Sequence, residues 1–343
     1  MEGPLDLQTL CELESILHSL ITNDTSILDG LAQLLSVMQQ VQLRSEESNR
    51  LLREELRRLR EEIRNSTPGG PEAKAGARGA KGSILLGEDE FSAQNPEAGL
   101  LAYLFPFLPD RVAIDVGANA GAVSERLLKA GYSVYAFEPH GPSFQALREK
   151  LGGNESFHAF DYAIGAADGT MDLHIAADLS GANKWDTTLF HSLVQHPMLP
   201  DLQFADSVPV RVRSLDSLCQ SGEIPARGGV LKIDAEGFDI EVMRGMGKMA
   251  FSVVLTEFWD PAHPFGREAK TGLADQVAEM RARGYERYIV IYRLDEVSTL
   301  SFYCNRCETV PKSWGNAVFF ADAAMFSKAY SWCEEVLVAT LYR

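Results

Sequence analysis

The residues best suited to chemistry stand in a glycine-rich turn that follows a short apolar segment. The segment Val112–Val116 carries one acid, Asp115, and the turn after it runs through Gly117 and Asn119 to Gly121. Glycine has no side chain to keep a ligand from the backbone, and it adopts conformations that other residues avoid. A helix that begins near Gly121 would direct its first N–H groups into the same crevice. The pattern predicts a ligand site at the carboxyl end of a buried strand.

A second acid, Glu138, indicates what this ligand is. It ends an apolar segment and lies 21 residues after Gly117, the separation at which a carboxylate reaches the two hydroxyl groups of a ribose. The turn reads G-x-x-x-G, with Asn119 in place of the second glycine of the dinucleotide pattern G-x-G-x-x-G. A nucleoside with an amino-acid tail, S-adenosylmethionine, therefore fits better than a nicotinamide dinucleotide. An NAD-dependent oxidoreductase remains the alternative enzyme class.

Further ionisable residues follow two later apolar segments. Lys232 and Asp234 alternate onto one face of an otherwise apolar strand, where a buried charge must be paired or functional. Glu257 ends the next such segment, and His263 follows between two prolines. Transfer of a methyl group to a hydroxyl benefits from a general base, and Asp234, Glu257 and His263 are the candidates. The alternatives are a structural ion pair with Lys232 for Asp234 and an ordinary surface loop for His263.

Two features nearby bear on metals and on the acceptor. The carboxylates of Asp234, Glu236 and Glu257 suit Mg²⁺, which prefers oxygen ligands, but nothing in their spacing requires a metal and none is predicted. The stretch from Asp186 to Phe204 is a long insertion of the kind that often covers a substrate. We expect this insertion to contact the acceptor.

Five short motifs occur together in this order. They are Asp115–Gly121, Phe137–Pro139, Ala163–Gly165, Ser214–Leu218 and Leu231–Phe238. Together they resemble the FkbM family of class I S-adenosylmethionine-dependent methyltransferases, over about residues 112 to 260, and 316–320 resembles a late strand of that family. One departure is Ala235, because the family usually has Asp-Val-Glu-Gly where this chain has Asp-Ala-Glu-Gly.

The resemblance implies an O-methyltransferase that uses S-adenosylmethionine and often acts on sugars or polyketide-type metabolites. The residues that it implies for the methionine end of the donor are Asp115, Gly117, Asn119 and Gly121. It implies that Glu138 binds the ribose and that Asp161, which precedes Tyr162, accepts a hydrogen bond from the adenine amine. The alternative for Asp161 is a solvated loop acid. The acceptor stays open, and a small molecule or glycan is expected.

The sequence pattern of residues 84–343 is typical of an α/β domain with a doubly wound, mostly parallel sheet. Short β-branched or apolar segments alternate with helical stretches, and several of these segments are apolar throughout, as buried parallel strands are. Strands are expected at 112–116, 133–138, 157–164, 208–212, 230–234, 253–257, 288–292 and 317–321. Helices are expected at 121–130, 142–151, 239–245 and 267–283.

The residues before this domain differ in composition. One heptad register holds from Leu28 to Ile63, and most of its core positions are Leu, Ile or Met. Residues 1–66 are therefore predicted as a helical segment that forms a coiled coil and a homo-oligomer. The alternative is a single amphipathic helix that lies on the globular domain. Residues 67–83, rich in Gly, Ala and Pro, are predicted as a flexible linker.

Composition excludes several other classes of protein. The formal net charge of −16 argues against nucleic acid or an anionic membrane surface as the main partner. The five cysteines do not form a disulfide framework, and the pair Cys304 and Cys307 lacks the other ligands of a structural zinc. No signal peptide or bilayer-length apolar run is recognised, which favours a cytoplasmic protein. A non-catalytic scaffold that recruits partners through its coiled coil remains the second alternative.

Overall fold

The computed structural model describes residues 96–182, 184–267, 272–293 and 300–340. The predicted coiled coil and linker, 1–66 and 67–83, lie outside the described residues. Within the described residues, every helix is too short or too polar to cross a lipid bilayer.

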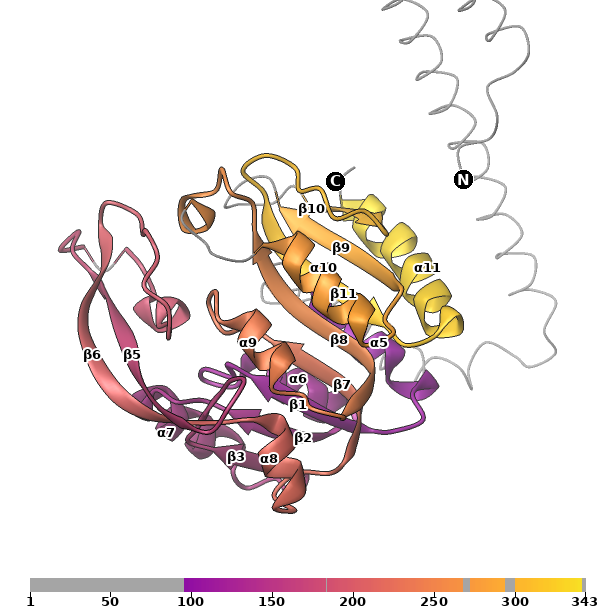
Figure 1. Ribbon diagram of the computed structural model, residues 1–343, viewed down its shortest axis with the longest axis horizontal. Coiled ribbons are helices and arrows are strands. Elements are labelled where there is room, and N and C mark those ends of the chain that lie inside the picture. The colour runs from indigo at the N-terminus through magenta and orange to yellow at the C-terminus, as the bar shows by residue number, and fades with distance from the viewer. Residues whose placement is uncertain (1–95, 183, 268–271, 294–299, 341–343) are drawn as a thin grey trace, which may run out of the picture. The chain divides into compact units, whose positions relative to one another are not determined.

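The centre of the fold is an eight-stranded sheet in the order β10-β9-β11-β8-β7-β1-β2-β3 (Figure 1). Its strands are β1 (Val112–Val116), β2 (Ser133–Phe137), β3 (Phe157–Phe160), β7 (Arg227–Ile233), β8 (Ala250–Trp259), β9 (Arg287–Arg293), β10 (Leu300–Cys304) and β11 (Trp314–Phe320). Strands β3, β2, β1, β7 and β8 pair in parallel, and β11 lies antiparallel between β8 and β9. This confirms the predicted α/β fold with a mainly parallel sheet. The chain leaves β1 toward β2 on one side and returns to β7 on the other, so ligands are expected at the carboxyl ends of β1 and β7.

Helices cover both faces of this sheet. They are α5 (Pro96–Leu104), α6 (Ala122–Ala130), α7 (Gly141–Leu151), α8 (Leu215–Gln220), α9 (Asp239–Arg244), α10 (Leu273–Ala282) and α11 (Ala323–Thr340). Successive residues of a strand face opposite sides, so Ala113 and Ile114 of β1 belong to different apolar clusters. The cluster of Ala113 includes Leu101 of α5 and Leu127 of α6, and that of Ile114 includes residues of α8, α9 and α10.

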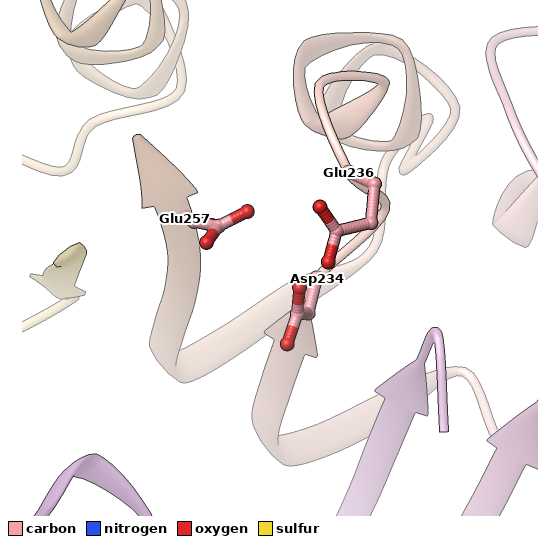
Figure 2. A group of neighbouring side chains, drawn as sticks. All are labelled: Asp234, Glu236 and Glu257. Atoms are coloured by element: carbon pink, nitrogen blue, oxygen red, sulfur yellow. The ribbon is translucent and has the colours of Figure 1, made fainter. Parts of the chain in front are cut away.

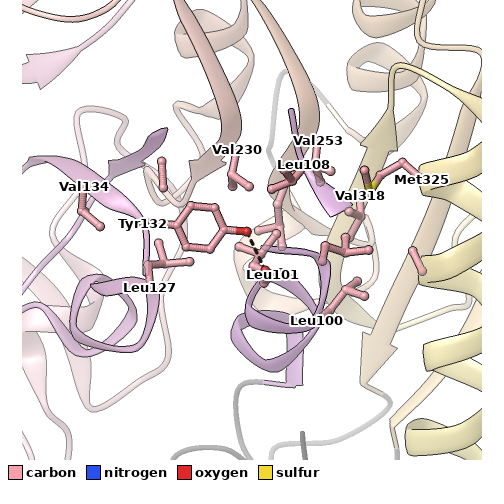
Figure 3. Close-up of a cluster of buried hydrophobic side chains, with 14 of the residues drawn as sticks. Leu100, Leu101, Leu108, Leu127, Tyr132, Val134, Val230, Val253, Val318 and Met325 are labelled. Atoms are coloured by element: carbon pink, nitrogen blue, oxygen red, sulfur yellow. Dashed lines mark hydrogen bonds between the residues drawn. The ribbon is translucent and has the colours of Figure 1, made fainter. Parts of the chain in front are cut away.

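Figure 3 shows part of the first cluster, in which Tyr132 is almost fully buried. Its hydroxyl donates a hydrogen bond of 2.7 Å to the carbonyl oxygen of Leu101, so the polar end of this large side chain is satisfied inside the core. Burial raises the pKa of the Tyr132 hydroxyl. This hydrogen bond links the segment before β2 to α5.

A second, three-stranded sheet contains β4 (Ala163–Ile164), β5 (Gly169–Asp178) and β6 (Leu202–Arg213) in the order β4-β6-β5. Strands β5 and β6 form a long antiparallel pair that extends away from the main sheet (Figure 1). The single strand predicted at 157–164 is wrong, because the chain leaves the main sheet after Phe160 and enters the second sheet at Ala163. The insertion between β5 and β6 contains the short helix η3 (Thr187–Phe190).

Candidate functional site

Two cavities lie at the carboxyl ends of the parallel strands. The first encloses about 100 Å³, and its wall includes Gly117 and Asn119 from the turn after β1, Glu138 after β2, and Asp234 after β7. Tyr162, between β3 and β4, also lines it. The structure therefore brings together four of the predicted site residues, at the end of the sheet where the topology expects a ligand.

In the turn after β1, a side chain at position 117 or 121 would clash with other parts of the protein. Gly117 has φ +72°, and a Cβ built on it would lie 1.8 Å from the carbonyl oxygen of Asp234. Gly121 has φ +81°, and its Cβ would lie 2.5 Å from Cδ1 of Leu147. Both glycines have the unusual φ that the sequence predicts, and each also avoids a clash with another part of the chain. That they make room for a ligand remains a prediction. Gly121 does not line the first cavity, whereas Gly117 does.

Replacing Gly117 with alanine is expected to lower the free energy of unfolding by about 3 kcal/mol or more, because a rigid carbonyl blocks the new methyl group and φ is positive. Gly121→Ala should cost less, about 1–2 kcal/mol, since Leu147 meets the methyl group with the end of a flexible side chain. Urea denaturation of both variants measures the difference. Equal losses would contradict the close approach of Asp234.

Glu138 is buried and is held by the backbone on both sides. Its Oε2 accepts a hydrogen bond of 2.8 Å from the N–H of Asn119, and its Oε1 accepts one of 2.8 Å from the N–H of His140. Burial raises the pKa of Glu138 to about 7, although these two hydrogen bonds and Lys232 lower it. Each carboxylate oxygen retains a further lone pair, so the group can accept hydrogen bonds from two hydroxyls of a ligand.

Lys232 of β7 lies beside Asp115 of β1, and these two residues are partners in the strand register. Its Nζ lies 3.0 Å from Oδ1 of Asp115 and 3.5 Å from Oδ2 of Asp234, and it donates a hydrogen bond of 3.1 Å to the carbonyl of Gly117. Asp115 is fully buried and accepts a second hydrogen bond, of 2.6 Å, from the hydroxyl of Ser124. Burial lowers the pKa of Lys232, but Asp115 and Asp234 outweigh it and raise that pKa above its usual value. Asp115 thus supports the turn and does not line the first cavity.

Three carboxylates converge where the chain leaves β7 and β8 (Figure 2). One oxygen each of Asp234, Glu236 and Glu257 lies within 4.8 Å of the others, a spacing that can hold a divalent cation. Burial, together with the neighbouring carboxylates, raises the pKa of Glu236 and of Glu257 well above their usual values. Glu236 also has φ +49°, an uncommon conformation for this residue type that orients the turn after β7.

The second cavity, of about 660 Å³, lies on the Glu257 side of these carboxylates. Its wall includes Glu257 and Trp259 from the end of β8, Asp239 from α9 and Gln276 from α10. The Asp239 carboxylate accepts hydrogen bonds from the Thr256 hydroxyl, at 3.0 Å, and from the N–H of Glu257, at 3.2 Å. These contacts fix the end of β8 against α9 and so position Glu257.

The insertion between β5 and β6 contacts both cavities. Thr188, Leu189 and His191 line the first, and residues 194–196 line the second, while Leu193 lines both. The side chain of Asn119 donates a hydrogen bond of 3.2 Å to the Thr188 hydroxyl, which ties the insertion to the turn after β1. From the sequence, this insertion is expected to contact only the acceptor. No pattern within residues 186–204 indicates that they also reach the glycine-rich turn.

Two predicted site residues lie away from the cavities. The side chain of Asp161 is exposed and lies 3.9 Å from Arg211, and the residue lines neither cavity. His263 accepts a hydrogen bond of 3.3 Å from the N–H of Phe265 and lines neither cavity. Burial lowers the pKa of His263. Of the three candidate bases, the structure therefore places Asp234 and Glu257 at a cavity wall.

The chain is similar in sequence to known proteins. The family described as "Methyltransferase FkbM domain" matches residues 115–287. The chain is 26% identical over 162 residues to the 2-O-methyltransferase NoeI of Sinorhizobium fredii, a match that covers 44% of this chain and 65% of that protein. It is 28% identical over 148 residues to the hexuronic acid methyltransferase AglP of Haloferax volcanii, covering 42% of this chain and 53% of that protein.

The chain spans between half and two thirds of the length of these two relatives. Among solved structures, a putative O-methyltransferase from Klebsiella pneumoniae is similar with 13% identity and a TM-score of 0.36, over 76% of this chain and 94% of that one. That likeness is too loose to bear on function. The family match covers just over half of the 343 residues and includes the turn after β1, Glu138 and the turn after β7, so the chain belongs to the FkbM methyltransferase domain family.

Proposed function

We propose that this chain transfers a methyl group from S-adenosylmethionine to a hydroxyl oxygen of a sugar or glycan. The observation that carries the proposal is the buried carboxylate of Glu138, which lines the first cavity beside the turn from Gly117 to Asn119. A carboxylate at the end of the second strand of such a sheet is suited to the two hydroxyls of a ribose.

A second polar group in the first cavity fits the same ligand. Oδ1 of Asn119 is buried without a hydrogen-bond partner, and Asn119 lines the cavity next to Glu138. Buried polar atoms normally have partners, so an acceptor without one favours a ligand that brings a donor. The hydroxyls and the ammonium group of S-adenosylmethionine are such donors. The residues present therefore suit this cofactor, and Glu138 and Asn119 are the groups that would hold it.

The acceptor class is supported by the names of the two relatives. One is a 2-O-methyltransferase and the other acts on a hexuronic acid, which is a sugar. The larger second cavity, of about 660 Å³, lies within the range of about 300–1,000 Å³ that is usual for small-ligand sites. We assign the donor to the first cavity and the acceptor to the second.

The chain itself has to orient the acceptor hydroxyl and receive its proton. The bound donor supplies an electrophilic methyl group, so the hydroxyl oxygen must be aligned with it and must lose its proton as the new bond forms. The Glu257 carboxylate lines the acceptor cavity, and its raised pKa brings it closer to that of an effective base at neutral pH. Asp234, on the donor side, is the second candidate.

Calorimetry with the full chain tests the donor assignment. We expect heat of binding for S-adenosylhomocysteine and none for NAD, together with transfer of a labelled methyl group from S-adenosylmethionine to a glycan. An oxidoreductase would show the opposite preference. Absence of any binding by S-adenosylhomocysteine would overturn the proposal and leave a non-catalytic scaffold.

The affinity for S-adenosylhomocysteine is expected to depend on pH through Glu138. Its pKa of about 7 means that lowering the pH from 8 to 6 protonates the carboxylate and removes an acceptor for the ribose hydroxyls. Binding should weaken by about tenfold, because one pH unit below the pKa adds tenfold competition by protons. His191 does not produce this change, since burial lowers its pKa to about 4, and burial lowers the pKa of His140 as well. Titrations at pH 6, 7 and 8 measure it, and a constant affinity would contradict the role of Glu138.

A further inference from the structure

We infer that Asp234, Glu236 and Glu257 form a binding site for a divalent cation such as Mg²⁺, between the two cavities. The role given to the ion in methyl transfer rests on the proposed function, whereas the binding of the ion does not. The inference is carried by the spacing of the three carboxylates, by buried oxygens beside them that have no partner, and by the place of the group between the cavities.

The main sheet brings the three carboxylates together from two neighbouring strands. Strands β7 and β8 pair in parallel with Ile233 opposite Thr256, so the next residues, Asp234 and Glu257, leave the sheet side by side. Glu236 follows in the turn after β7, and Figure 2 shows the three carboxylates directed toward one another. The register of the sheet therefore collects three oxygen ligands that the spacing in the sequence does not reveal.

The distances between these carboxylates suit a hard divalent cation. One oxygen of each lies within 4.8 Å of the others, and the group contains neither His nor Cys. Two oxygens on one ion lie at most twice the metal–oxygen distance apart, which is about 4.1 Å for Mg²⁺ and about 4.9 Å for Ca²⁺. An ion can therefore contact all three after a small movement of the side chains. Oxygen ligands alone favour Mg²⁺, Mn²⁺ or Ca²⁺ over Zn²⁺.

Two buried oxygens at this place have no hydrogen-bond partner. One is Oε2 of Glu257 itself. The other belongs to Gln276, which is 6% exposed and whose Nε2 donates a hydrogen bond of 2.7 Å to the backbone carbonyl of Glu257. Oε1 of the same amide is left buried and unpaired. Buried polar atoms normally have partners. A cation would satisfy the carboxylate directly, and water on the cation would donate a hydrogen bond to the amide.

The positive side chains near the group do not neutralise it. Nζ of Lys232 lies 3.5 Å from Oδ2 of Asp234, but it lies closer, at 3.0 Å, to the fully buried Asp115. Burial and the surrounding acids raise the pKa of Glu257 well above its usual value, although Arg293 lowers it. Protons therefore relieve part of the repulsion when no ion is bound. A divalent cation relieves it with two charges and displaces those protons.

The group lies between the two cavities. Asp234 and Glu236 line the first cavity, and Glu257 lines the second. An ion held by all three carboxylates is therefore in reach of a hydroxyl bound in the second cavity. The same ion faces the first cavity, to which the donor is assigned.

An ion at this place would assist the proposed transfer as a Lewis acid. It would hold the acceptor oxygen and favour the loss of its proton. The proton passes to the oxygen of Glu257 that the ion leaves free. The electron pair of the acceptor oxygen forms the bond to the methyl carbon, while the bond from that carbon to sulfur breaks and leaves its electron pair on sulfur.

Binding of Mn²⁺, followed by electron paramagnetic resonance of the free ion, tests the site. The full chain is stripped with EDTA, transferred to buffer without chelator and titrated at high salt, which screens the acids on the surface. We expect one strong site per chain, from which Mg²⁺ displaces Mn²⁺. Glu236→Gln and Glu257→Gln should each weaken binding at least about tenfold, because each removes a charged ligand. Glu149→Gln, on the exposed side of α7, is the control and should bind as the wild type does.

Thermal unfolding separates the loss of a ligand from the loss of the fold. In EDTA, Glu236→Gln should unfold at the temperature of the wild type or higher, because it removes one of three like charges. Added Mg²⁺ should raise the unfolding temperature of the wild type and of Glu149→Gln, but not that of Glu236→Gln. Mn²⁺ that binds all these chains equally, or an equal rise in their unfolding temperatures, would overturn the inference.

Two further measurements keep the cation site apart from the proposed function. Labelled methyl transfer should fall at least about tenfold in EDTA and recover with Mg²⁺, and transfer that EDTA does not change would overturn the role of the ion. Calorimetry with S-adenosylhomocysteine reports on the first cavity alone. A strong Mn²⁺ site in a chain that does not bind S-adenosylhomocysteine would leave the cation site standing and show that the proposed function is wrong. Binding of S-adenosylhomocysteine without a strong Mn²⁺ site would show the reverse.

Discussion

Replacing Glu138 with alanine is expected to weaken the binding of S-adenosylhomocysteine by at least about 100-fold. Hydrogen bonds to a charged group are worth about 1.5–3 kcal/mol each, and the two ribose hydroxyls would lose such a partner together. The same substitution removes the acceptors of the Asn119 and His140 N–H groups, so the turn after β1 loses a support as well. Isothermal calorimetry at pH 8, where the carboxylate is charged, measures the effect.

Two controls separate the ligand contact from the structural support. Glu149→Ala removes an exposed carboxylate from α7 and should leave the affinity unchanged. Glu138→Gln retains one acceptor oxygen and the size of the side chain, so it should fall between the wild type and the alanine variant. If Glu138→Ala is folded by circular dichroism and binds as tightly as the wild type, the ribose contact is not at this residue.

Replacing Lys232 with methionine is expected to lower the free energy of unfolding by about 3–5 kcal/mol. The ammonium group is buried and lies 3.0 Å from Asp115, which is itself fully buried, so the variant leaves an uncompensated charge between β1 and β7. Loss of the hydrogen bond to the carbonyl of Gly117 should loosen the turn after β1 and weaken donor binding too. Urea denaturation measures the first effect and calorimetry the second.

A matched substitution on the surface is available for comparison. Lys129 is 71% exposed and pairs with Glu125 one helical turn away, so Lys129→Met should change the free energy of unfolding by less than about 0.5 kcal/mol. The double variant Asp115→Asn/Lys232→Met removes both buried charges and should recover part of the loss. Equal stability of the two single lysine variants would show that the Lys232–Asp115 pair contributes nothing.

Local patterns predict the elements of the main sheet well. The predicted strand 112–116 has the same bounds as β1, because an apolar run followed by a glycine turn marks both of its ends. By contrast, β5 is not predicted, because it lacks the continuous apolar run by which the buried strands are recognised: Met171, Leu173 and Ile175 alternate with polar residues, and its strand partner is β6. The break after Phe160 is also missed, because both flanking segments are apolar and only the tertiary structure assigns them to different sheets.

The site residues likewise fall into those that local patterns predict and those that only the tertiary structure places. Glu138 and Asn119 follow from the spacing of a strand, a turn and the next strand, and both line the first cavity. Asp115 is part of the same motif, yet its partner Lys232 lies 117 residues away and is brought to it by the register of β1 and β7. Gln276 belongs to a helix whose sequence shows no sign of function, and the packing of α10 against the end of β8 places it in the wall of the second cavity.

The hydrogen bond between Asn119 and Thr188 has a kinetic consequence. It joins the insertion to the turn that lines the first cavity, and the same insertion continues into the wall of the second cavity. If the proposed donor binds in this space of about 100 Å³, the insertion has to move, because a nucleoside is larger than the cavity. Release of the proposed donor product should then be coupled to movement of the insertion, and this movement would limit the rate of turnover.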